Sequence, residues 1–166
     1  MEEIFTRRSI RNYTEEEIEE EKIKQLLKAG MAAPSAGNEQ PWHFIVIDDN
    51  QVMEEIMEFH KYATMLDQAQ RAIVVCGDKS LEKYEGFWVQ DCAAATQNIL
   101  LAAESEGLGA VWLGVHPAAE RVKNAKELFD LPEEVVPFSI IAVGHPAVER
   151  KRNDRYQEDR IHSNSW

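Results

Sequence analysis

Arginine is the residue type whose placement in this chain points most clearly to chemistry. The guanidinium group is planar and donates two parallel charged hydrogen bonds, which suits it to phosphate and other oxyanions. Seven of the nine arginines lie near the two ends of the chain, namely Arg7, Arg8, Arg11, Arg150, Arg152, Arg155 and Arg160. A chain with a formal net charge of −12 that gathers its arginines in this way predicts an anion-binding site. The alternative is that these residues are solvated charges in two terminal segments.

The N-terminal arginines stand in one compact run, residues 7–11 (RRSIR). Arg7, Arg8 and Arg11, together with the hydroxyl of Ser9, can meet several oxygens of one phosphate group at once. A basic run on the surface is the simpler interpretation of the same residues. The run therefore indicates a phosphate site only in combination with other segments.

A second segment, residues 34–42 (PSAGNEQPW), has the composition of a loop that lies against a flat ligand. Small residues such as Ser35 and Ala36 let the backbone approach closely, while Pro34 and a second proline stiffen the loop. The amide groups of Asn38 and the nearby glutamine offer donors and acceptors for ring heteroatoms. A plain connector between a helix and a strand is the alternative.

A third segment, residues 106–115 (EGLGAVWLGV), places two glycines before a strand-like run. A dinucleotide-binding fingerprint needs a strand, then glycines, then a helix, whereas here a helix precedes the glycines and a strand follows them. We therefore reject a dinucleotide-binding fold. Gly114, at the end of the strand, can instead present backbone N–H groups to a ligand.

Regular elements must position these segments, and their order predicts the fold. A helix is expected from Thr14, where Thr14 and Glu17 form a capping-box pattern, up to Pro34. Further helices are predicted over residues 52–59, 87–104 and 118–129, and strands over residues 42–47, 72–76, 110–115 and 138–143. Strands that alternate with helices predict an α/β or α+β domain with a sheet between helices. The alanine-rich helix 87–104 is apolar on nearly every side, so we expect a partner to cover it.

Composition argues against several classes of function. The negative net charge disfavours non-specific nucleic-acid binding, and no apolar run approaches the ~18 residues of a membrane span. The acidic N-terminus does not resemble a targeting peptide, so the cytoplasm is the expected compartment. Cys76 and Cys92 stand in apolar runs and are predicted to be buried free thiols. The five histidines lack ligand spacing, so no metal site is expected.

The three segments, in this order, resemble the nitroreductase family of FMN enzymes. The resemblance covers essentially the whole chain: RRSIR, PSAGNEQPW, the alanine-rich central helix, GLGAVWLGV, and a closing GHP with an arginine-bearing tail. It implies an α+β fold in which helices flank a central, mostly antiparallel sheet, with a single FMN-binding domain over residues 1–166. It also implies an intertwined homodimer whose C-terminal tail, about residues 147–166, reaches over the partner subunit.

The resemblance assigns the phosphate end of a tightly bound, non-covalent FMN to the arginine clusters. Arg7, Arg8 and Ser9 would hold the phosphate and ribityl oxygens. A tail arginine would close on the phosphate, with Arg155 the first choice and Arg152 the second. The family often has a lysine two residues before that arginine, where this chain has an asparagine, Asn153.

The resemblance assigns the ring end of FMN to the other segments. Arg11 would lie near the pyrimidine edge, and Leu113 and Gly114 would direct backbone amides toward N5, with Trp112 beside them. The isoalloxazine would also be packed by loop residues of the other subunit, namely Pro34, Ser35, Ala36 and Asn38.

The activity that the resemblance implies is oxidoreduction. FMN would take a hydride from NADH or NADPH and pass it through N5 to a nitroaromatic, quinone or similar small acceptor in a ping-pong cycle, without a catalytic acid or base from the protein. Arg11 would stabilise the anionic reduced ring. Two alternatives stay open: a non-catalytic FMN-binding or regulatory dimer, and a flavin enzyme of the same fold that dehalogenates its substrate or cleaves flavin with oxygen. Nothing in the sequence selects the physiological acceptor.

Overall fold

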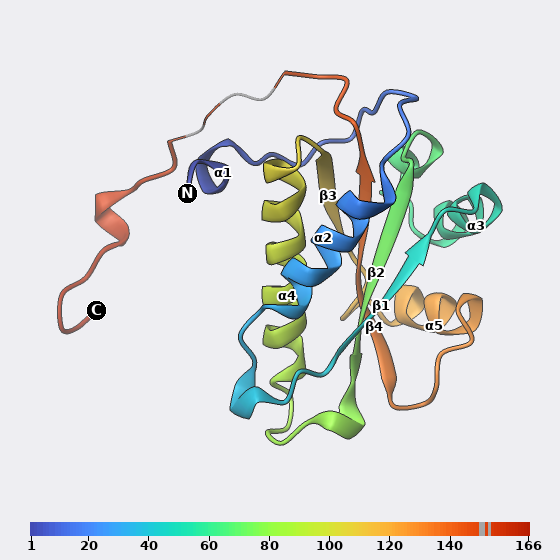
Figure 1. The fold of residues 1–166 in the computed structure, drawn as a ribbon. Coiled ribbons are helices and arrows are strands. Elements are labelled where there is room, and N and C mark those ends of the chain that lie inside the picture. Colours follow the sequence, from blue (N-terminus) through green and yellow to red (C-terminus); the bar gives the residue numbers. More distant parts are fainter. Residues whose placement is uncertain (150–151, 153) are drawn as a thin grey trace.

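Four antiparallel strands form one sheet in the order β1-β2-β4-β3 (Figure 1). The structure is a computed structural model that describes residues 1–149, 152 and 154–166. The strands are β1 Trp42–Ile47, β2 Arg71–Asp78, β3 Gly109–Gly114 and β4 Val135–Gly144. Each predicted strand is confirmed, with boundaries that move by a few residues. The edge strands are β1 and β3, so one side of β3 remains open to other segments.

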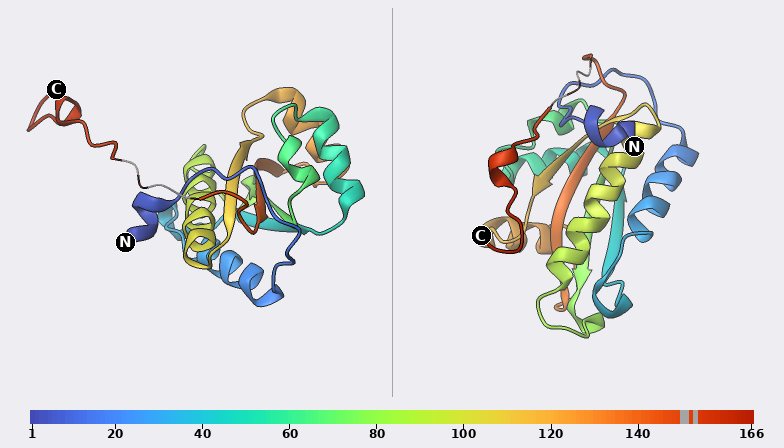
Figure 2. Two further views of the ribbon diagram at one scale, coloured as in Figure 1. Left: turned by 90° about the horizontal axis from the view of Figure 1, so that it is seen from above. Right: turned by 90° about the vertical axis from the view of Figure 1, so that its left-hand side faces the viewer.

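Helices cover both faces of this sheet, which gives three layers (Figures 1 and 2). The helices are α1 Glu2–Thr6, α2 Glu20–Met31, α3 Asn50–Phe59, α4 Trp88–Ser105 and α5 Ala119–Leu128. One face is covered by α2 and α4, the other by α3 and α5. The sheet's own alternation explains this arrangement, because Ile73 and Val75 pack toward α4 while Ala72 and Val74 pack toward α3.

The predicted start of the first long helix at Thr14 is wrong, because α2 begins at Glu20. Thr14 Oγ1 accepts from Glu16 N–H at 3.4 Å and closes a local turn instead of capping a helix. Tertiary contacts keep this segment extended: Thr14 N–H donates to His145 O at 2.9 Å. The buried ring of Tyr13 lies over Gly144, where a Cβ would stand 2.7 Å from the ring. Long-range contacts therefore decide the conformation of this segment, although its local sequence fits a helix N-terminus.

The helix predicted to be apolar on nearly every side, α4, is only partly covered within one chain. Cys92, Ala95 and Ile99 face the sheet and are fully buried. On its other side, Ala93 and Leu101 are half-buried. An apolar stripe of α4 thus remains available to a further layer.

Both cysteines are buried free thiols, as predicted. Burial raises the pKa of Cys76 to about 12, and it raises the pKa of Cys92 further. Neither thiol is ionised near neutral pH, so both behave as small apolar groups. Over the part of the chain that the structure describes, no helix is both long and apolar enough to cross a bilayer.

Residues 154–166 extend away from the three layers (Figures 1 and 2). Their apolar side chains are uncovered in the single chain: Tyr156 is 70%, Ile161 58% and Trp166 101% exposed. Arg150 and Asn153, both considered in the sequence analysis, lie outside the described residues.

Candidate functional site

A pocket of about 330 Å³ opens between α1 and the C-terminal tail, and we call it the arginine pocket. It is lined by residues from both ends of the chain, namely Ile4, Phe5, Arg7, Arg8, Asp154, Arg155 and Tyr156. The two arginine clusters that the sequence separates by about 140 positions therefore meet in space. The lining carries three guanidinium groups and one carboxylate, so its net charge suits an anion.

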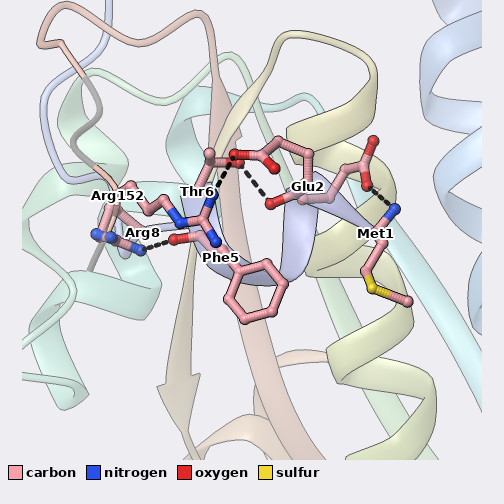
Figure 3. Close-up of polar contacts among 7 residues, drawn as sticks. Met1, Glu2, Phe5, Thr6, Arg8 and Arg152 are labelled. Carbon is pink, nitrogen blue, oxygen red and sulfur yellow. Dashed lines mark hydrogen bonds and ion pairs between the residues drawn. The ribbon is translucent and has the colours of Figure 1, made fainter. Parts of the chain in front are cut away.

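Arg8, in the lining of the arginine pocket, has a buried donor that is not used within the described residues. Its Nη1 donates to the carbonyl oxygen of Phe5 at 3.0 Å (Figure 3). Its Nη2 is buried and has no hydrogen-bond partner in the described part of the chain. A buried charged N–H without an acceptor is costly, and an oxyanion in the pocket would supply that acceptor.

The two candidate tail arginines occupy different places. Arg155 lines the arginine pocket, whereas Arg152 lies over the ring of Phe5, with 4.8 Å between its Cζ and the ring centre. Arg152 Nη1 also lies 3.6 Å from Glu2 Oε1 (Figure 3). Arg152 thus ties the tail to α1, and Arg155 is the one that reaches the pocket.

A second pocket of about 400 Å³ lies along the outer edge of β3, and we call it the strand-edge pocket. Its lining comes from four segments, namely Arg11, His60, Lys61, Tyr62, Thr64, Met65, Trp112, Leu113, Gly114 and Arg121. Three permanent cations line it and none of these residues is a carboxylate, although the chain as a whole is strongly acidic. The pocket is therefore suited to an electron-rich or anionic group.

The N-terminal segment links the two pockets because it runs alongside β3. Ser9 forms a parallel bridge with Ala110, and Ile10 N–H donates to the carbonyl oxygen of Ala110 at 3.0 Å. Ile10 packs so closely on Gly109 that a Cβ there would stand 2.7 Å from its side chain. Gly109, the first residue of β3, thus leaves room for the segment whose next residue, Arg11, lines the strand-edge pocket.

Six residues of the strand-edge pocket were not predicted as site residues, and two of them, His60 and Arg121, contact the same backbone oxygen. His60 Nε2 lies 3.0 Å from the carbonyl oxygen of Gly114, and Arg121 Nη1 donates to the same oxygen at 2.8 Å. His60 ends α3 and is 1% exposed, and burial lowers its pKa. Arg121 offered one weak signal in the sequence, since it is an arginine outside both terminal clusters and lies in the first turn of the helix after β3.

The loop over residues 34–38 lies in neither pocket. Ala36 N–H donates to Asp91 Oδ1 at 3.0 Å, which holds the loop at the first turns of α4. By contrast α1 lies against Leu101 and Ala102, about ten residues and hence about 15 Å further along the helix. Pro34 and Asn38 are exposed, so the outer surface of this loop faces away from the rest of the described chain.

Two buried carboxyl groups, those of Glu39 and Asp91, accept hydrogen bonds from backbone N–H groups at this loop. Glu39 Oε2 accepts from the backbone N–H of Lys83 at 2.7 Å, and Asp91 accepts from Ala36. The second oxygen of each carboxyl group, Glu39 Oε1 and Asp91 Oδ2, is buried without a donor among the described residues. The two carboxyl groups interact directly, so burial and the neighbouring Glu39 raise the pKa of Asp91.

An α+β domain with one cationic pocket at the edge strand β3 and another between α1 and the tail belongs to the class of domains suited to an anionic ligand, and comparison gives the family. The sequence profile of the Nitroreductase family matches residues 4–63 and 58–145. A Methanothermobacter thermautotrophicus protein, provisionally named an NADH dehydrogenase/NAD(P)H nitroreductase, is 52% identical over 166 residues, which is 100% of this chain and 87% of that protein. The chain belongs to the nitroreductase family.

Solved structures agree with this assignment. A Clostridium acetobutylicum protein, provisionally named an NADH oxidase, superimposes with a TM-score of 0.96 at 48% identity, over 99% of each chain. A provisionally named Desulfovibrio desulfuricans nitroreductase in complex with FMN superimposes with a TM-score of 0.86 at 33% identity, over 99% of this chain and 96% of that one. The α+β, nitroreductase-like fold expected from the sequence is confirmed.

Proposed function

We propose that this protein is an FMN-dependent NAD(P)H oxidoreductase of the nitroreductase type that works as a homodimer. The observation that carries the proposal is the unpaired, buried Nη2 of Arg8 in the arginine pocket. It lies three residues before Arg11, which lines the strand-edge pocket. One extended segment therefore offers charged donors to both ends of a ligand that has a phosphate at one end and a ring at the other.

The residues present fit FMN. In the arginine pocket Arg7, Arg8 and Arg155 would hold the phosphate, and Ser9, on the segment that leaves it, would meet the ribityl chain. In the strand-edge pocket Arg11 would lie beside the ring. A fixed cation there interacts more strongly with a ring that gains negative charge than with a neutral one, so Arg11 would favour reduction.

The strand-edge pocket would receive the redox partners. Bound FMN supplies the hydride chemistry, taking a hydride from NADH or NADPH and delivering it to a nitroaromatic, a quinone or a similar acceptor. Met65, Trp112 and Leu113 contribute apolar side chains to the pocket wall. Gly114 adds no side chain to it. Half-buried His116, whose pKa is lowered by desolvation, contacts Trp88 edge-on at 4.8 Å between ring centres and stays outside this lining.

The homodimer completes the site. Pro34, Ser35, Ala36 and Asn38 lie apart from both pockets of their own chain, so we assign them to the ring face of the partner's FMN. The half-buried stripe of α4 and the exposed apolar side chains of the tail would be covered by the same contact. The tail, about residues 147–166, would then reach over the partner, and residues 1–166 form one domain.

The cytoplasm is the compartment that we propose for this enzyme. Two free, un-ionised thiols at Cys76 and Cys92 are typical of a reducing compartment. Small molecules are its expected partners besides the second subunit. The negative net charge disfavours nucleic acid.

The visible spectrum of the protein as isolated, before and after addition of NADH or NADPH, tests the cofactor and the activity together. A yellow protein that either donor bleaches, and that a quinone restores, supports the proposal. Tight FMN without turnover from either donor would leave the FMN-binding regulator as the correct function. A colourless protein that takes up no FMN refutes the proposal entirely.

A mixed dimer tests whether two subunits share the site. Arg8→Ala damages the arginine pocket, and Pro34→Glu places a carboxylate in the exposed loop. If each site combines one chain's arginines with the other chain's loop, co-expressed variants form mixed dimers with one intact site, so about a quarter of all sites regain FMN. No recovery in the mixed dimers means that the loop and the arginines serve the same chain.

A further inference from the structure

Gly114 stands at the end of the edge strand β3, with its backbone directed away from the sheet. In an antiparallel pair, residues alternate between bonding inward to the neighbouring strand and pointing outward. Val115 N–H donates inward to Phe138 O at 3.1 Å, and Ala110 O accepts from outside the sheet, from Ile10. By this alternation the N–H and C=O of Gly114 point outward, toward the strand-edge pocket that it lines.

Gly114 is paired with Ser139 of β4 on its inner side, whereas its outer side faces the edge of the sheet. It lacks the Cβ that restricts φ and ψ in other residues, and its outward groups have no strand partner. A Cβ built on Gly114 would meet no atom within 4 Å, so the chain itself leaves the space above it open. The ladder bond from Val115 N–H to Phe138 O holds the Gly114–Val115 peptide from inside the sheet, and a second restraint acts on the outward carbonyl oxygen of this peptide.

His60 and Arg121 supply that restraint from two different helices. Their donors converge on the carbonyl oxygen of Gly114 at 3.0 Å and 2.8 Å. His60 is buried at the end of α3, where its backbone N–H donates to Ile56 O at 3.0 Å. Ile56 is fully buried in the core. Arg121 stands in α5 with its guanidinium 5.6 Å from the ring centre of Tyr62.

The contact also fixes the state of the histidine ring. A carbonyl oxygen only accepts, so Nε2 must carry the proton in this contact. Nδ1 is buried and has no partner among the described residues, which disfavours a second proton there. The guanidinium of Arg121, bound to the same oxygen, also disfavours a positive charge on the ring. The geometry thus specifies a neutral, Nε2-protonated His60.

We infer that His60 and Arg121 are positioning residues that clamp the Gly114 carbonyl and thereby hold the Gly114 N–H toward the cofactor ring. The inference rests on the proposed function, because the ring is that of FMN. Neither residue need touch the ring for this role. Each acts through Gly114, whose orientation decides whether its N–H meets a ring atom.

The test compares FMN affinity among variants that remove or keep each donor. His60→Leu and Arg121→Met remove a donor, whereas His60→Gln keeps an amide N–H close to the place of Nε2. Arg71→Met is the matched control, because Arg71 Nη1 also donates to a backbone carbonyl, that of Gln70, at 2.8 Å, but lines neither pocket. Titration of apoprotein with FMN, followed by flavin fluorescence, gives the dissociation constant.

We expect the donor-removing variants to bind FMN about tenfold more weakly, a change of 1.4 kcal/mol. His60→Gln and Arg71→Met should bind as the parent does. The clamp is overturned if the donor-removing variants match the parent, if His60→Gln is as weak as His60→Leu, or if Arg71→Met weakens binding equally. A parent protein that binds no FMN refutes the proposed function and this inference together.

A second measurement keeps the clamp testable without FMN or variants. The ¹⁵N chemical shifts of the imidazole nitrogens report which of them carries a proton. A neutral ring of His60 protonated at Nε2 at pH 7 supports the clamp. A ring protonated at Nδ1, or at both nitrogens, contradicts it even if the parent binds FMN.

Discussion

Replacing Asp91 by asparagine should stabilise the protein, which is unusual for a change at a buried charged residue. Asp91 Oδ1 accepts from Ala36 N–H, and an asparagine oxygen can accept this bond equally well. The buried Oδ2 has no donor, and it is part of a carboxyl group that interacts with Glu39. In Asp91→Asn an NH₂ group takes the place of Oδ2 and can donate to Glu39 Oε1, so two unsatisfied oxygens are removed at once.

The size of the effect follows from this exchange. A hydrogen bond to a charged group contributes about 1.5–3 kcal/mol to stability. For a chain of this length each kcal/mol moves the thermal midpoint by about 2–4 °C. A gain of about 2 kcal/mol therefore predicts a midpoint about 6 °C higher for Asp91→Asn near pH 8.

The gain should depend on pH in a defined direction. Burial, followed by the nearby carboxylates of Glu39 and Glu82, raises the pKa of Asp91 above its ordinary value of 3.8. The native protein then holds a proton that the unfolded chain has released, so the parent loses stability as the pH rises through the raised pKa. At low pH this proton bridges the two carboxyl groups in the parent, and the advantage of Asp91→Asn disappears.

Thermal denaturation from pH 4 to pH 8 measures this prediction. Asp49→Asn is the matched control, because exposed Asp49 accepts from Gln51 N–H at 2.8 Å and caps α3 without a neighbouring buried carboxylate. Asparagine is an equally good N-cap, so this control should leave the midpoint unchanged at every pH. Two results would contradict this reasoning: a midpoint of Asp91→Asn equal to the parent's at pH 8, or a gain that does not shrink at pH 4. Either would show that the Asp91–Glu39 pair does not destabilise the parent protein.

Three further experiments have expected outcomes of their own. Gly114→Ala should leave the thermal midpoint unchanged, since its Cβ meets no atom of the chain, but it should weaken FMN uptake by obstructing the pocket. Gly77→Ala should do the reverse and destabilise the fold by about 1–3 kcal/mol, because its Cβ would overlap the ring of Trp88; equal midpoints for both variants would refute this contrast. Cys76 and Cys92 should resist alkylation in the native protein at pH 8 and react after unfolding, and mass spectrometry of a native sample that shows rapid labelling would contradict their burial.

The strands were predictable because each forms a short run of apolar, β-branched residues bounded by turn residues. The β2 run, for example, is buried on both faces and reads as uninterrupted hydrophobic sequence from Ala72 to Cys76. The start of α2 was not predictable in the same way. Thr14 and Glu17 carry a valid capping pattern, and long-range contacts, among them the packing of Tyr13 over Gly144, keep the segment extended instead.

The residues of the candidate site also differ in whether the sequence could indicate them. Residue type made Arg8 and Gly114 candidates for contacts with a ligand, and the family resemblance assigned them to the phosphate and the ring. His60 gave no such signal, since its partner Gly114 lies 54 positions away in the sequence and the two meet only where the end of α3 reaches the end of β3. The contact between Glu39 and Asp91 likewise joins a loop to a helix across 52 positions, so periodicity could not reveal it.

Dimerisation and FMN binding should be a single linked equilibrium if the loop and the arginines of each site belong to different chains. A ligand that binds only the assembled state stabilises that state, by about 2.7 kcal/mol per site when its concentration is 100 times its dissociation constant. The exposed side chains of Tyr156, Ile161 and Trp166 would be buried when the dimer forms, and this burial of apolar surface would add to the stability of the dimer. The dimer dissociation constant must then fall as FMN is added. A dissociation constant that is independent of FMN concentration would place each complete site within one chain, whatever the exposed tail contributes to the interface.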